Sequence, residues 1–143
     1  MKLHKDQDVA LLLIGELATN RLRIISLGDI ASRHGLSVLF LKKIARQLKA
    51  AGILTSKEGN GGGYILAKKP SEITAWDVLV AVSDHARDVT LGSTLNRDCP
   101  LLALCLPQHI HREVHDSIKE GLVRLTYDKL VRELYDGRKY VSK

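Results

Sequence analysis

The sequence has no long apolar run and very little cysteine. None of its apolar segments approaches the roughly 20 residues that a helix needs to cross a membrane, and the N-terminus has no apolar signal-peptide core. We therefore expect a cytoplasmic protein with no membrane segment. In a reducing compartment, the two cysteines, Cys99 and Cys105, are more typical of reactive thiols or metal ligands than of a structural disulfide. Two buried, inert cysteines are the alternative.

Residue sets that would indicate an enzyme are also lacking. Ser93 and His85 come close in the sequence but have no third residue to orient them, and the glycines near Tyr64 do not have the spacing of a phosphate-binding loop. We therefore expect that the protein is not an enzyme.

The chain is small and basic. Its 143 residues, with a formal charge of +6, fit one compact domain plus an appendage, and a helix-rich chain of this size often completes its core by dimerising. This excess of basic residues favours contact with phosphate, but it is equally compatible with charged side chains that only contact solvent.

A glycine-rich hairpin is the most informative feature. Residues 53–57 and 63–68 are predicted strands, and they flank Gly59-Asn60-Gly61-Gly62. Glycines can adopt the positive φ of a tight turn and allow backbone to approach a phosphate closely. This hairpin is typical of the wing of a winged helix-turn-helix.

The preceding segment, residues 27–48, has the pattern of a helix-turn-helix. Ser26 is placed to cap a first helix, which ends at His34-Gly35, and Ser37 caps a second. Lysines on an exposed helix face are usually only solvated, but here a helix and a wing together form one docking surface. We predict DNA contacts from Ser37, Val38, Lys42, Lys43, Arg46, Lys57, Asn60 and Gly61.

The other elements complete a mainly α fold with a small β-hairpin. Apolar spacing predicts a first helix over residues 5–18 and a long last helix over 109–135, whose apolar seam suggests an antiparallel helix pair across a twofold axis. We expect a winged helix-turn-helix domain over residues 1–82, a cysteine-containing sensor loop over 83–108, a dimerisation helix over 109–135 and a frayed tail over 136–143.

Several sequence blocks together resemble one family. They are IASRHGLSVLFLKKIARQLKAAGIL, GNGGGYILAK and ITAWDVLVAV, followed by a cysteine loop before a long helix. Over nearly its whole length the chain resembles the IscR/NsrR family of winged-helix repressors, also called the Rrf-two superfamily. The resemblance implies a cytoplasmic homodimer that binds a partly palindromic operator in double-stranded DNA. In many members an iron-sulfur cluster controls that binding in response to iron-sulfur status, nitric oxide or redox stress.

The cysteine loop departs from the usual family pattern. Cluster-bearing members typically have three cysteines here; Cys99 and Cys105 match the last two, and Ser93 lies nearest the missing first. One branch of the family holds a 2Fe-2S cluster with two cysteines, a carboxylate in the first helix and a histidine in the helix-turn-helix. By that resemblance, the metal ligands would be Cys99, Cys105, Asp8 and His34, and a 2Fe-2S cluster is favoured over a 4Fe-4S cluster.

Other interpretations remain open at the sensor. His34 before Gly35 is also an ordinary way to end a helix, and His109 could replace it as a ligand. Cys99 and Cys105 could instead form a thiol or disulfide switch. Some relatives without clusters are controlled by a partner protein or act as protein-interaction modules, which is the main alternative function.

The wing has a further departure. Family wings often carry an arginine before the glycines, whereas this chain has Lys57-Glu58-Gly59. Because Glu58 repels phosphate, either Lys57 takes over the contact or the recognition helix supplies more of the binding.

Overall fold

The computed structural model describes residues 3–20, 23–83 and 106–141, so Cys99 and Cys105 lie outside the described residues. Within them, the chain forms helices around one small hairpin, as expected. In order, the elements are α1 (Lys5–Thr19), α2 (Leu27–His34), α3 (Val38–Ala50), β1 (Leu54–Lys57), β2 (Gly63–Leu66), a 3-10 turn η1 (Pro70–Glu72), α4 (Ala75–Ala81), α5 (Leu106–Val123) and α6 (Tyr127–Val141).

Helices α2, α3 and α4 each follow a hydroxyl residue that caps them, and two of these caps, Ser26 and Ser37, were predicted from the sequence. Ser26, Ser37 and Thr74 each accept a hydrogen bond from the backbone N–H three residues later, at 3.1, 3.4 and 3.1 Å. In α4, a carboxylate oxygen of Asp77 also accepts a hydrogen bond from the backbone N–H of Thr74 at 3.0 Å, which completes a capping box. These bonds satisfy helix N–H groups that would otherwise have no partner within the helix.

The hairpin is antiparallel, with Leu54 opposite Leu66 and Lys57 opposite Gly63. At its tip, Gly59 has φ 93°, in the left-handed region that glycine adopts without steric cost. The winged helix-turn-helix architecture predicted from the sequence is therefore present.

A third backbone segment joins the hairpin. Ile25 and Tyr64 exchange two backbone hydrogen bonds, of 3.1 and 2.9 Å, so the connector before α2 lies along β2. This bridge fixes the hairpin relative to the helix-turn-helix.

Helix α1 lies at the centre of the core, where it packs against α3, α4 and α6. Helices α1, α2, α3, α4 and α6 and the hairpin share one apolar cluster, and Leu122 of α5 packs on a second, smaller one formed by Trp76 and Leu79. The largest fully buried side chains are Leu13, Ile14, Leu17, Ile30, Leu41, Ile44, Leu48, Ile73, Val78 and Leu79.

The structure divides the helix expected over residues 109–135 into α5 and α6. The backbone N–H of Ala75 donates to the carbonyl of Leu125 at 2.8 Å, and that of Tyr127 donates to the carbonyl of Ile73 at 2.9 Å. These bonds pair residues 125–127 with residues 73–75 at the start of α4, so one continuous helix cannot run through this segment. Helix α6 then runs to Val141, so residues 136–141 are helical rather than frayed.

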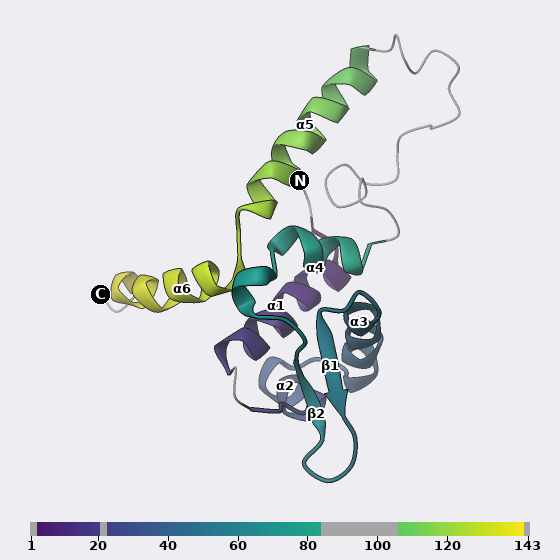
Figure 1. Ribbon diagram of the computed structural model, residues 1–143, viewed down its shortest axis with the longest axis vertical. Helices are drawn as coiled ribbons and strands as arrows, with labels where there is room; N and C mark the ends of the chain where they lie inside the picture. The colour runs from purple at the N-terminus through teal and green to yellow at the C-terminus, as the bar shows by residue number, and fades with distance from the viewer. Residues whose placement is uncertain (1–2, 21–22, 84–105, 142–143) are drawn as a thin grey trace.

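Helices α5 and α6 project from the compact body (Figure 1). The hairpin tip points to the opposite end of the molecule from α5, with α3 beside the hairpin. None of the helices in the described part of the chain combines the length and apolar character needed to cross a bilayer.

Candidate nucleic-acid interface

One face of α3 is exposed and basic. Val38, Lys42 and Arg46 follow one another at four-residue spacing and therefore share a face of the helix. All three are exposed, Val38 at 39%. Within the described residues, the side chains of Lys42 and Arg46 have no hydrogen bond or ion pair. Both cations are therefore available to a phosphate or a base edge.

Lys43 has a different environment from its neighbour. Its Nζ lies 2.9 Å from a carboxylate oxygen of Asp6 in α1 and 5.9 Å from the centre of the Phe40 ring. The side chain of Lys43 is 60% exposed, so it remains accessible to DNA. The sequence alone could not reveal this pair, because its members are 37 residues apart.

The wing presents the other predicted contacts. Lys57, Asn60 and Gly61 are exposed on it, together with the acidic Glu58. At the end of β2 next to the turn, a Cβ on Gly63 would lie 2.4 Å from the carbonyl oxygen of Ile25. This glycine is therefore required by the packing of the protein itself, apart from any approach of phosphate.

Helix α3 and the hairpin are held side by side (Figure 1). Lys49, in the last turn of α3, donates from Nζ to the hydroxyl of Ser56 in β1 at 2.6 Å. Helix α3 also packs directly against β1. In a winged helix-turn-helix, such a helix enters the major groove while the wing reaches the flanking backbone or minor groove.

Sequence reasoning missed Leu39. This side chain lies in the first turn of α3 and is 78% exposed, the highest value among the large hydrophobic residues that the structure describes. The first turn of a recognition helix contacts base edges, and an apolar side chain there can contact the methyl group of thymine. An apolar residue outside the helix's buried stripe was the signal that could have identified it.

The predicted metal ligands are only partly described. His34 ends α2, and its Nε2 lies 2.8 Å from Oε1 of Glu16, which also pairs with Arg33 at 3.0 Å. Asp8 is exposed in the first turn of α1. Glu16 lies eight residues after Asp8 on α1, a rise of about 12 Å along the helix axis. The described ion pair of His34 is thus with Glu16 and not with Asp8.

The remaining candidate ligands add no described cluster. Nδ1 of His109, the proposed substitute ligand, lies 2.9 Å from the guanidinium of Arg112. Among residues 3–20, 23–83 and 106–141, no group of three or more His, Cys, Asp or Glu side chains could hold a metal. Cys99, Cys105 and Ser93 fall outside these ranges.

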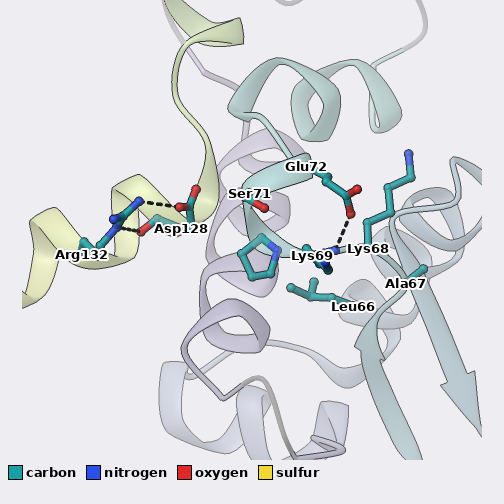
Figure 2. Close-up of a pocket in the computed structure, with 9 residues that line it drawn as sticks. Leu66, Ala67, Lys68, Lys69, Ser71, Glu72, Asp128 and Arg132 are labelled. Carbon is teal, nitrogen blue, oxygen red and sulfur yellow. Dashed lines mark hydrogen bonds and ion pairs between the residues drawn. The ribbon is translucent and has the colours of Figure 1, made fainter.

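A separate hollow of about 930 Å³ lies where η1 meets α6 (Figure 2). In it, Arg132 pairs with the carboxylate of Asp128 at 2.6 Å, and Glu72 accepts from the backbone N–H of Lys69 at 3.0 Å. Asp128, Arg132 and Glu72 are thus engaged within the chain, whereas Lys68 and Lys69, which also line the hollow, have no side-chain partner among the described residues.

The sequence matches one protein family over most of its length. Residues 3–133 match the family model Rrf2, described as iron-dependent transcriptional regulators. The chain belongs to this family. Its winged helix-turn-helix and its exposed recognition helix are therefore those of an Rrf2-family transcriptional regulator, and the family and its relatives are regulators rather than enzymes.

Individual proteins also match the chain in sequence. The protein rrf2 of Nitratidesulfovibrio vulgaris is 37% identical over 109 residues, covering 76% of this chain and 72% of that protein. The transcriptional regulator IscR of Pectobacterium atrosepticum is 34% identical over 75% of this chain and 64% of its own length.

Solved structures show the same fold. IscR of T. potens superimposes with a TM-score of 0.75 at 25% identity, over 94% of this chain and 88% of that one. CymR, the global cysteine regulator of B. subtilis, gives 0.72 at 26% identity, over 92% and 97%.

Proposed function

We propose that this Rrf2-family regulator is a sequence-specific DNA-binding repressor. In this proposal α3 enters the major groove, Lys42 and Arg46 contact phosphates or bases, and the wing residues Lys57 and Asn60 contact the flanking backbone. The observation that carries the proposal is the pair of exposed cations on α3 beside a wing held by Lys49 and Ser56. A basic face of this shape complements the phosphate backbone.

Selection from a pool of randomised duplexes tests sequence specificity. A twofold dimer should enrich a partly palindromic site, because its two recognition helices face adjacent turns of one side of the duplex. Arg46→Gln should relax the preference at a single position of each half-site if Arg46 contacts a base. Recovery of duplexes without any shared sequence would contradict the proposal.

The proposed dimer uses the exposed apolar face of α5. Ile110 is 53% and Val114 42% exposed, and they are four residues apart on one side of an 18-residue helix. Covering such a pair against a second copy removes apolar surface from water, which favours association. Helix α5 projects from the compact body of the protein (Figure 1).

We further propose that the regulator senses its signal through an iron-sulfur cluster, with Cys99, Cys105, Asp8 and His34 as the ligands. The family description as iron-dependent supports a role for iron.

The described residues fit this assignment. Glu16 contacts Nε2 of His34 and leaves Nδ1 for a metal, and a carboxylate on the second ring nitrogen is the usual partner of a ligating histidine. Two thiolates with one oxygen and one nitrogen ligand suit a 2Fe-2S cluster better than a 4Fe-4S cluster. When bound, a cluster would supply sensitivity to oxidation state and to nitric oxide.

Anaerobic reconstitution tests this assignment. The wild type should take up iron and sulfide in equal amounts and give the Mössbauer spectrum of a 2Fe-2S cluster, whereas Cys99→Ala should not. His34→Ala should weaken uptake, and Glu120→Gln, an exposed change on α5, is the control. Uptake by His34→Ala at the level of the wild type would remove this histidine from the ligand set.

A thiol switch is the second candidate for the sensor. It is favoured by the likeness to CymR of Staphylococcus aureus, whose solved structure is described as an oxidized form and superimposes with a TM-score of 0.71 at 26% identity. In this alternative Cys99 and Cys105 form a disulfide and no iron is bound. Failure of the wild type to take up iron, together with a mass decrease of two hydrogens on oxidation, would support it.

A further inference from the structure

The first turn of α1 lies against the recognition helix. Asp6 of this turn accepts from Nζ of Lys43 at 2.9 Å. The ammonium of Lys5 lies 5.2 Å from the centre of the Phe40 ring, and that of Lys43 lies 5.9 Å from it. Two cations, one from α1 and one from α3, therefore lie near a single aromatic ring, and Asp6 pairs with one of them.

A buried side chain fixes this turn in place. Gln7 is 3% exposed; its Oε1 accepts from the backbone N–H of His4 at 2.9 Å, and its Nε2 donates to the hydroxyl of Ser83 at 3.1 Å. Buried polar groups are costly unless they are hydrogen-bonded, so these bonds restrict the position of the turn. Asp6, the preceding residue, is thereby kept beside α3.

The placement of Asp6 has an electrostatic consequence for DNA. Lys43 is adjacent to Lys42 on α3 and more than half exposed, so a phosphate that approaches this edge of the helix meets the carboxylate of Asp6 as well. Asp6 neutralises Lys43 in the free protein and repels the phosphate. For Lys43 to bind DNA, its ammonium must leave the carboxylate of Asp6 and pair with a phosphate instead.

We propose that the first turn of α1 is a third element of the DNA-binding surface, in which Asp6 acts as an internal counter-charge for Lys43 and limits the affinity for DNA. This inference rests on the proposed function. Asp6 is 34% exposed and Lys43 60%, and ion pairs with such exposure are weak. The pair is weak enough for DNA to displace, yet strong enough to change the affinity measurably.

A double-mutant cycle tests the proposal with a probe that does not require knowledge of the operator. The probe is a mixed-sequence duplex of about three helical turns, whose binding depends on phosphate contacts. Asp6→Asn should tighten binding about two- to fivefold at low salt, the range that an exposed ion pair represents. It should also steepen the slope of log affinity against log salt by up to about 0.9.

The cycle must show that Asp6 acts through Lys43. Adding Lys43→Gln should remove most of the gain from Asp6→Asn, and Lys43→Gln alone should weaken binding less than Lys42→Gln does. Glu133→Gln is the matched control, since Glu133 pairs with Lys129 at 3.9 Å on α6; it should leave binding unchanged.

Two results would overturn the proposal. One is an Asp6→Asn variant with the DNA affinity and salt slope of the wild type. The other is a gain in affinity from Asp6→Asn that is equally large in the wild type and in the Lys43→Gln variant. Either would leave the proposed function intact if Lys42→Gln still weakens binding. If Lys42→Gln has no effect, the proposed DNA surface itself is wrong.

Discussion

At the scale of single residues, two glycines illustrate opposite requirements. A Cβ on Gly63 would lie 2.4 Å from the Ile25 carbonyl oxygen, which is too close for two non-bonded atoms, whereas nothing lies within 4 Å of the Cβ position of Gly15 in α1. The first glycine is required by its neighbour, and the second only lowers the helix propensity of α1.

Substitution by alanine should therefore change stability in opposite directions. We expect Gly63→Ala to lower the free energy of unfolding by about 1 to 3 kcal/mol, as an overpacked site does, and to disturb the bridge between Ile25 and β2. Gly15→Ala should raise it by roughly 0.5 to 1 kcal/mol. Urea denaturation measures both, and a neutral Gly63→Ala would show that the wing does not pack as closely as described.

At the scale of elements, the attachment of α6 depends on its first residue. Tyr127 is 3% exposed, and its hydroxyl donates to the carbonyl of Leu11 in α1 at 3.3 Å. Burial raises the pKa of Tyr127 well above its ordinary value of 10.0, because the charged phenolate is poorly solvated there.

The raised pKa predicts a loss of stability in alkali. Below pH 10 the phenol is protonated in both the folded and the unfolded chain and does not change the balance. Above that pH the unfolded chain releases the proton more readily, so folding stability falls as pH rises. Tyr127→Phe should flatten this alkaline dependence in urea denaturation between pH 8 and 11, while a dependence as steep as that of the wild type would contradict the burial of the phenol.

The elements that the sequence predicted have local causes. Ser26 and Ser37 cap their helices through hydrogen bonds to backbone groups only three residues later in the sequence. The break between α5 and α6 was missed because apolar residues continue across it without glycine or proline. The break is caused by the pairing of residues 125–127 with residues 73–75, which apolar periodicity does not reveal.

The same distinction between local and long-range causes applies to the residues of the functional surface. Exposure of Lys42 and Arg46 follows from helical periodicity and was predictable. The partners of Lys43 and His34 are 37 and 18 residues away in sequence, so only the packing of α1 against the helix-turn-helix brings them together.

At the scale of the whole molecule, α5 sets the expected oligomeric state. Substitution of Leu122 would be a poor test of the proposed dimer interface, because this side chain packs against Trp76 and Leu79 of its own chain. Ile110 and Val114 are exposed instead. Ile110→Glu with Val114→Glu should give a monomer in sedimentation equilibrium, because two charges would have to be buried at the interface.

Leu39→Glu is the matched control for this experiment, since it places a charge on an exposed apolar side chain of α3. It should remain dimeric. Persistence of a dimer at micromolar concentration in the α5 double variant would place the interface elsewhere.

The central claim is that α3 binds duplex DNA through its free cations, and the salt dependence of DNA binding tests it most directly. Lys42→Gln and Arg46→Gln should each weaken binding and reduce the slope of log affinity against log salt by about 0.9 for every phosphate that the variant no longer neutralises. Lys129→Gln on α6 should leave both quantities unchanged. Wild-type affinity and wild-type slope in the Lys42→Gln and Arg46→Gln double variant would contradict the account.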